Sequence, residues 1–364
     1  MKNRYAVLTA ALLFPLTASV AFAQAPAAVP SAPAPQTPRV QVPPASLTAP
    51  PAPAAPTTPP ADPLPPANPK FFTATSPSLD TVNAFLNQVW GFDPERIYRV
   101  MAIQKTPAPG VVKVTVFITT HGPDAKVQGA TFYITPDGKH AIGEASGVVP
   151  FGAAPFADVR DLLRARADGA YRGAASKDLE LVEFADLQCP HCKEAQATVD
   201  QIVKDFPKAH VVFQLFPLVE IHSSAFKAAA YGVCAQKVSN EAFFKFAAGV
   251  FDTQEGLSPT TDDTILKAAA MRAGLDGAAI AACAETQATK DIVNADIKLA
   301  QDAGVDQTPL LSANGRLLPL TSVNYDDLKR LIQFQANLDG VDSGATPETL
   351  APKPTQPVLQ TLPK

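Results

Sequence analysis

The prolines of this chain are concentrated in one stretch, and that stretch limits how much of the chain can fold. Of the 37 prolines among 364 residues, 17 lie within residues 24–69, where only two side chains are charged, and five more follow Gly340. Segments of this composition bury too little apolar surface to offset the entropy lost when they become ordered. We therefore expect residues 24–69 and 341–364 to be disordered, which leaves roughly 270 residues for about two packed domains.

The first 23 residues have the features of a secretory signal peptide. Lys2 and Arg4 precede the apolar stretch 6–22, and the Ala-Phe-Ala sequence at 21–23 matches a small-residue cleavage site. We expect cleavage after Ala23 and export to the periplasm, an oxidising compartment in which disulfides persist. The proline-rich linker that follows would favour polyproline II and serve either as a spacer from an envelope surface or as a passive tail.

Charge and hydropathy exclude two classes of function. The formal net charge is −4, the isoelectric point is near 5.8, and no basic run occurs. The chain therefore lacks the positive surface that nucleic-acid binding requires. Beyond the N-terminus, no apolar stretch is long enough to cross a bilayer.

Residues 70–168 predict a small α+β module. A helix is expected over 80–90, where apolar side chains recur at helical spacing, and a second over 155–167. Between the helices lie three segments rich in β-branched and aromatic residues, which predict strands over 97–104, 111–120 and 130–135. The module contains no cysteine and its histidines are isolated, so we assign it no chemistry. Its role would be dimerisation, substrate holding or shielding of the second module.

The second module, residues 169–340, carries the chemistry. A buried-strand pattern over 178–185 is followed by a Cys-Pro-His-Cys sequence at 189–192 and then by helical periodicity. Unpaired N–H groups and the helix dipole at a helix N-terminus favour a thiolate, and such sites lower a cysteine pKa from about 8.5 to between ~3.5 and ~7.5. Pro190 suits the first helical turn, and His191 can add positive charge or a donor beside the sulfur. The pattern predicts a redox-active pair of cysteines.

Two other interpretations of the CxxC spacing have less support. A zinc site needs about four ligands, and neither a second CxxC nor an HxxxH pattern occurs, so we expect no metal. A disulfide made only for stability is uncommon at this spacing, because Cys189 and Cys192 would close a very small loop. In the redox interpretation the reactive disulfide itself takes the place of a bound cofactor.

This part of the chain resembles the DsbA-like thiol-disulfide oxidoreductases of the thioredoxin superfamily. The matching segments are Glu183-Phe184, 189–192, Phe216-Pro217-Leu218, His222, 228–235, 304–309 and 314–316. The resemblance covers about 178–338, nearly the whole second module. It implies an α/β chain: a thioredoxin-like fold with a helical insertion at about 223–303, preceded by the small α+β module and the disordered linker.

The resemblance also implies roles for the residues around the two cysteines. Cys189 would be the exposed nucleophile that forms mixed disulfides, Cys192 its buried resolving partner, and His191 the residue that tunes the thiolate. Glu183 would relay a proton to or from Cys192; a solvent-facing place on the strand is the alternative. His222 matches a recurrent family position, where capping or packing fits at least as well as catalysis.

A substrate groove is implied on the other side of the cysteines. Pro309 would be a cis-proline facing them, and the backbone of Thr308 before it would pair with an extended peptide. Pro190, between the cysteines, is included in this substrate-binding set.

Two further cysteines fall in the expected helical insertion. Four helical segments are expected there, over 225–235, 241–251, 261–273 and 278–299. Cys234 lies on the first segment and Cys283 on the last, and in an exported protein we expect them to form a disulfide. It would close a loop of about 50 residues and contribute about 4 kcal/mol in the chain-entropy account. Two buried free thiols are the alternative.

The expected function is formation or exchange of disulfides in other proteins, with oxidase favoured over isomerase. The clients would be unfolded or reduced exported proteins, and a membrane redox partner would reoxidise the enzyme. The hairpin at 133–139 resembles the dimerisation domain of the DsbC and DsbG isomerases. A homodimeric isomerase, joined through residues 70–168, is therefore the alternative, and a non-catalytic thioredoxin-like binder of clients is a further one.

Overall fold

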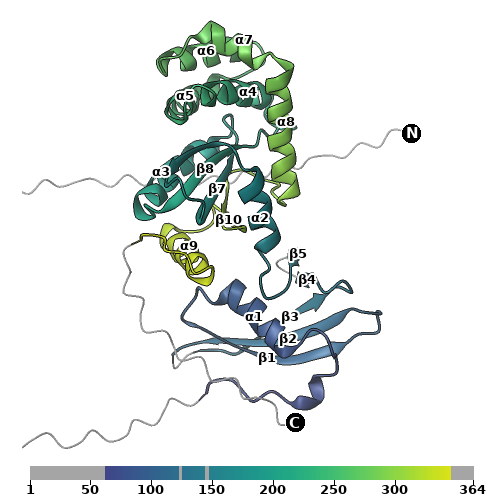
Figure 1. Cartoon of the computed structure of the whole chain (residues 1–364). Helices are drawn as coiled ribbons and strands as arrows, with labels where there is room; N and C mark the ends of the chain where they lie inside the picture. The colour runs from purple at the N-terminus through teal and green to yellow at the C-terminus, as the bar shows by residue number, and fades with distance from the viewer. Residues whose placement is uncertain (1–61, 123–124, 144–146, 346–364) are drawn as a thin grey trace, which may run out of the picture. The chain divides into compact units, whose positions relative to one another are not determined.

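The computed structural model describes residues 62–122, 125–143 and 147–345. The expected signal peptide, most of the proline-rich linker and nearly all of the C-terminal tail lie outside the described residues. Two sheets organise the described part (Figure 1). Each has five strands, in the orders β1-β2-β3-β4-β5 and β10-β9-β7-β8-β6. No helix within it is long and apolar enough to cross a membrane.

The ends of the described region are more ordered than the sequence predicts. Residues 62–69 fall in the linker expected to be disordered, yet Leu64 is 3% exposed and its carbonyl accepts a hydrogen bond from Arg99 at 2.7 Å. In the expected C-terminal tail, Ser343 is 2% exposed and its hydroxyl donates to Gln333 Oε1 at 2.7 Å. Side chains of the folded modules thus bind the first and last described residues, and composition does not reveal such contacts.

The first module is an antiparallel sheet packed against helix α1 (Leu79–Trp90). Its strands are β1 (Arg96–Lys105), β2 (Val112–Thr120), β3 (Gln128–Ile134), β4 (His140–Gly143) and β5 (Gly147–Pro150). Helix α1 buries Val82, Phe85 and Leu86 in the same cluster as the strand residues, and the short 3-10 helix η1 (Pro69–Phe71) precedes it. The predicted helix and first three strands are confirmed, whereas β4 and β5 are additional strands.

The second sheet lies between two layers of helices. Its strands are β6 (Ala170–Gly173), β7 (Leu179–Ala185), β8 (Ala209–Leu215), β9 (Leu310–Ala313) and β10 (Arg316–Pro319). The helices are α2 (Ala157–Arg166), α3 (Pro190–Asp205), α8 (Gln287–Asp302) and α9 (Tyr325–Leu338). β7 and β8 are parallel and the other neighbours antiparallel. All seven residues of β7 are buried, because α3 and α9 cover one face and α2 and α8 the other. The predicted α/β architecture is confirmed.

Helix α2 packs with the second sheet, although the sequence places it in the first module. Its buried Leu163 belongs to the same apolar cluster as Val182 of β7 and Val212 of β8. Strand β6, which the sequence does not predict, follows α2 and pairs with β8. An apolar helix face does not indicate which sheet it will cover, so this assignment depends on tertiary contacts.

A helical insertion separates β8 from β9. It contains α4 (Ala225–Gln236), α5 (Asn240–Thr253), η2 (Gln254–Gly256), α6 (Asp262–Arg272) and α7 (Gly277–Ala284), and α8 follows. Helix α4 contacts α5, α6, α7 and α8, and its residues 228–235 are all buried. The single helix expected over 278–299 is two helices, because Thr286 caps the start of α8: its hydroxyl accepts the Thr289 N–H at 3.3 Å.

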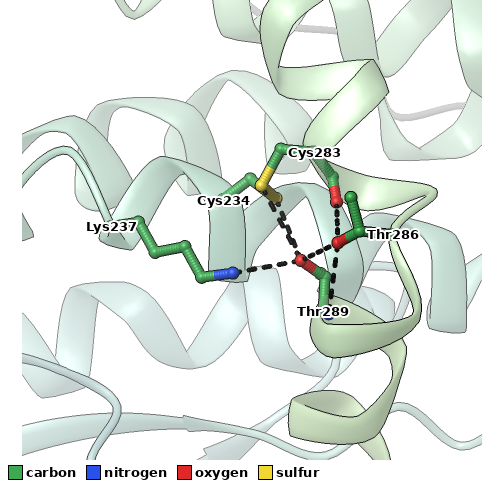
Figure 2. The surroundings of a disulfide bond; sticks show 5 residues. All are labelled: Cys234, Lys237, Cys283, Thr286 and Thr289. Carbon is green, nitrogen blue, oxygen red and sulfur yellow. Dashed lines mark hydrogen bonds between the residues drawn. A yellow bond between two sulfur atoms is a disulfide. The ribbon is translucent and has the colours of Figure 1, made fainter.

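A disulfide joins Cys234 of α4 to Cys283 of α7, with their Cα atoms 6.0 Å apart. Figure 2 shows the hydroxyl of Thr289 beside both sulfurs, at 3.6 and 3.7 Å. Lys237 Nζ donates to the same hydroxyl at 3.1 Å. The expected bond is therefore present, and these contacts link the ends of α4, α7 and α8.

Candidate active site

The N-terminus of α3 carries the Cys-Pro-His-Cys sequence. Cys189 is the N-cap residue of this 16-residue helix, and Pro190 stands at its first position. The N–H groups of Cys192 and Lys193 donate to the Cys189 carbonyl at 3.2 and 3.3 Å. The two thiols thus lie where the free N–H groups and the dipole of the helix favour negative charge.

A cis peptide bond between Thr308 and Pro309 lies against the first cysteine. The Cys189 Sγ lies 3.8 Å from the Thr308 carbonyl oxygen, although 119 residues separate them in the sequence. Cys189 was expected to be exposed, but only 4% of it is, because it packs in the core cluster of the insertion. Cys192 is 0% exposed, and the two thiols are not bonded to each other.

The surrounding residues shift the pKa values of the two cysteines in opposite directions. Hydrogen bonding from Cys192, with smaller contributions from Thr308 and the His191 backbone, lowers the pKa of Cys189 from 9.0 to about 5. Burial, followed by the effect of neighbouring Cys189, raises the pKa of the Cys192 thiol. At neutral pH the first cysteine is therefore a thiolate and the second a thiol.

Glu183 is buried beneath helix α3. It lies on β7, is 1% exposed, and burial raises its pKa from 4.5 to about 7. Gln196 of α3 donates through Nε2 to Glu183 Oε1 at 2.7 Å and to the Cys192 carbonyl at 3.1 Å. The solvent-facing alternative for Glu183 is therefore wrong. Gln196 therefore connects the Glu183 carboxyl, whose pKa is about 7, to the turn of α3 that contains Cys192. The sequence did not single out Gln196.

Asp186 is a further site residue that the sequence did not single out. Its carboxylate accepts the backbone N–H groups of Gln188 and Leu218, both at 2.8 Å. His222 Nδ1 lies 2.7 Å from the same carboxylate, so this histidine contacts Asp186 and holds the loop after β8. The Asp186 N–H donates to Cys192 Sγ at 3.4 Å. The signal available in the sequence was an acidic residue directly after a strand rich in apolar residues.

The side chains of Pro190 and His191 point to solvent. Both residues are exposed, and His191 Nδ1 lies 3.1 Å from Glu194 Oε2, a contact that raises the pKa of the imidazole. The backbone of His191, not its ring, supplies the hydrogen bond that helps to lower the pKa of Cys189. Within the described residues, no three His, Cys, Asp or Glu side chains form a cluster that could hold a metal ion.

Comparison with solved structures finds thioredoxin-like proteins. A thioredoxin-like oxidoreductase from Silicibacter pomeroyi is 24% identical, with 48% of this chain and 95% of that chain covered and a TM-score of 0.41. The catalytic domain of Proteus mirabilis ScsC is 22% identical over 49% of this chain and 98% of that chain, with a TM-score of 0.40. BdbD from Bacillus subtilis is 20% identical over 46% and 93% of the two chains, with a TM-score of 0.40.

Two curated proteins share a short segment with this chain. The Na(+)/H(+) antiporter NhaA 3 of Salinispora tropica is 33% identical over 58 residues, which are 16% of this chain and 9% of the antiporter. NhaA 1 of Salinispora arenicola is 32% identical over 54 residues, 15% of this chain and 8% of the antiporter. The chain therefore spans less than a tenth of these relatives, and no activity of theirs is assigned to it.

A match to a family profile agrees with the fold. Residues 166–334 match the profile of the family described as thioredoxin. This segment contains all five strands of the second sheet, helix α3 with its two cysteines, and the cis-proline. The profile match therefore assigns a thioredoxin-like fold to residues 166–334, a little less than half of the chain.

Proposed function

We propose that this protein is a DsbA-like thiol-disulfide oxidoreductase that forms or exchanges disulfides in other proteins through Cys189 and Cys192. The observation that carries the proposal is the inequality of the two cysteines. Cys189 caps α3 and has a pKa of about 5, whereas burial raises the pKa of Cys192. A thiolate nucleophile beside a protonated partner is the arrangement that thiol-disulfide exchange requires. Thr308 and cis-Pro309 beside Cys189 offer backbone for pairing with an extended client.

In the oxidising direction, the reaction begins with a disulfide between Cys189 and Cys192. A client thiolate attacks the Cys189 sulfur, so that a client–Cys189 disulfide forms and the bond to Cys192 breaks. The electron pair leaves on the Cys192 sulfur, which takes a proton. A second client thiolate then attacks the client sulfur of this mixed disulfide, and Cys189 leaves as a thiolate. The client gains one disulfide and loses two electrons, and both enzyme cysteines end reduced.

The proton taken up by Cys192 needs a nearby source, because burial disfavours the thiolate of this cysteine. We assign this role to Glu183, whose pKa is about 7 and whose carboxyl is joined through Gln196 to the Cys192 turn. In the reverse reaction, when Cys192 attacks a mixed disulfide, the same carboxylate would accept the proton.

The low pKa of Cys189 favours oxidation over isomerisation. A stabilised thiolate is a good leaving group and stabilises the reduced enzyme, which makes the disulfide form oxidising. The proposed clients are reduced or unfolded exported proteins, which the enzyme would reach through the signal peptide expected at residues 1–23. A membrane redox partner would reoxidise the two cysteines, and they carry both electrons without a bound cofactor.

The test compares wild type with Cys189→Ser in two assays: reduction of insulin, and disulfide formation in a reduced unfolded protein. We expect the substitution to abolish both activities, because every step passes through the Cys189 sulfur. Equal activity of the two proteins would refute catalysis and favour the alternative, a thioredoxin-like protein that only binds clients.

One feature of the first module favours the dimeric isomerase alternative. Tyr133, Ile142 and Val148 lie in register across β3, β4 and β5, and they are 41%, 41% and 65% exposed. Such an apolar row is suited to contact with a second copy of the chain. If it forms a dimer, Ile142→Glu should halve the mass measured by light scattering. The control Val238→Glu, at a 61% exposed residue of the other module, should leave the mass unchanged; a monomeric wild type would reject the dimer.

A further inference from the structure

The loop that carries the nucleophile is held by a glutamine from the helical insertion. Gln254 opens η2 and is 5% exposed. Its Nε2 donates to the Leu187 carbonyl at 3.2 Å and to the Cys189 carbonyl at 3.1 Å. These two carbonyls flank Gln188, so a single buried amide spans the last turn of chain before α3.

The Cys189 carbonyl is also where helix α3 begins. It accepts the N–H groups of Cys192 and Lys193, and Gln254 adds a third donor from a segment 65 residues away. The direction of this carbonyl fixes the peptide plane that follows Cys189. It therefore constrains where the Cys189 sulfur lies relative to Cys192 and to the Thr308 carbonyl.

A second glutamine makes the reciprocal contact from the loop to the insertion. Gln188 Oε1 accepts the Ser224 N–H, which precedes α4, at 2.8 Å. Gln188 Nε2 donates to the Leu257 carbonyl, directly after η2, at 3.3 Å. Gln188 of the loop before α3 thus bonds the insertion, and Gln254 of the insertion bonds the loop. The contacts of Gln254 are therefore part of a connected polar network.

We propose that Gln254 is a positioning residue for the redox reaction: it orients the Cys189 carbonyl and so places the nucleophilic sulfur at the start of α3. The inference deepens the proposed function and rests on it. The low pKa of Cys189 supports it, because hydrogen bonds from Cys192 and from the His191 backbone contribute to that shift. Each of these bonds depends on the position of the Cys189 sulfur. Without Gln254 the loop can move, these bonds lengthen, and the thiolate is less stabilised.

The test replaces Gln254 with methionine, which has similar volume and no N–H donor. Gln236→Met is the matched control, because Gln236 Nε2, at the end of α4, also donates to a backbone carbonyl, that of Asp168 at 2.6 Å. Two quantities are measured in full-length protein: the pH dependence of the ultraviolet absorbance of the Cys189 thiolate, and the single-turnover rate of client oxidation. The titratable side chains described at this site, Glu183, Asp186 and His191, are unchanged in every variant.

We expect Gln254→Met to move the thiolate titration to higher pH and to slow client oxidation on the order of tenfold or more, as loss of positioning does. Gln236→Met should leave the titration and the rate unchanged. A Gln254→Met protein that is less stable to heat but titrates as wild type would overturn the proposal, since a merely structural glutamine would behave in that way. If Gln254→Met does not fold, Gln254→Asn, whose amide is too short to reach both carbonyls, is judged by the same criterion.

The thiolate titration needs no turnover, so it separates this inference from the proposed function. A wild type without oxidase or reductase activity would refute the function. A Gln254→Met titration identical to wild type would refute the positioning role whether or not the enzyme is active.

Discussion

Replacing Glu183 by glutamine should make the protein more stable above neutral pH while slowing its reaction. The side chain is 1% exposed, and burial raises its pKa from 4.5 to about 7. Above that pH the folded protein holds a buried carboxylate whose hydrogen-bond donor, Gln196, is neutral. Glutamine at 183 has nearly the same shape, and its carbonyl can accept the same hydrogen bond without carrying a charge.

The sign and size of the effect follow from the two pKa values. Below 4.5 the carboxyl is protonated in both the folded and the unfolded chain, so it adds no pH-dependent cost there. As the pH rises toward about 7, the unfolded chain releases the proton first, and the folded state loses stability through this interval. The full difference corresponds to about 3 kcal/mol. The gain from E183Q should therefore grow from near zero in acid to about 3 kcal/mol in mild alkali.

Urea unfolding of wild type and E183Q across this pH range measures the difference in the free energy of unfolding. Asp296, another buried acid whose pKa is raised by burial to about 8, is present in both proteins, so its contribution cancels. Glu220→Gln, at an exposed glutamate, is the control and should change neither stability nor activity. A stability difference that stays constant with pH would refute the reasoning, because only a titrating buried carboxyl produces the slope.

Three further outcomes follow from the site and the insertion. The thiolate absorbance of Cys189 should have its midpoint near the pKa of about 5, and a midpoint near the ordinary value of about 8.5 would show that the helix terminus does not activate it. Cys192→Ser should trap clients as mixed disulfides that mass spectrometry detects and reductant removes; an active wild type whose variant traps none would contradict the resolving role. Replacing both Cys234 and Cys283 by alanine should lower the free energy of unfolding by about 4 kcal/mol for a sequence separation of 49. A loss below about 1 kcal/mol in urea unfolding would show that helix packing suffices without the bond.

The parts of the site that neighbouring residues determine could be predicted from the sequence. The CxxC spacing after a buried strand identified Cys189 and Cys192, and the resemblance to the DsbA-like family implied the cis-proline at 309 that the structure contains. Asp186 and Gln254 could not be found in this way. An aspartate or glutamine looks the same in sequence whether it bonds water or a distant backbone group, and these two act on partners 32 and 65 residues away.

In the fold, too, the sequence predicted the features that local patterns determine and missed those that depend on distant contacts. Helices and strands with strong periodicity, such as α1, β2 and β7, were predicted because burial of one face or of the whole strand sets their pattern. The placement of α2 against the second sheet and the break between α7 and α8 were not, because the first depends on which sheet is available and the second on one capping threonine. The short strands β4, β5 and β6 carry too few residues for a periodic signal.

The contacts around Cys189 also set the order in which the chain can become reactive. During synthesis this cysteine is made long before Gln254 and Thr308, which follow it by 65 and 119 residues and hold its carbonyl and its sulfur. Until those segments are in place, the contacts that position the Cys189 carbonyl and sulfur are missing. The complete set of contacts around Cys189 therefore forms only after these later segments pack against it. In a partly synthesised chain, Cys189 is therefore less able to compete for Cys234 or Cys283 before these two form their disulfide.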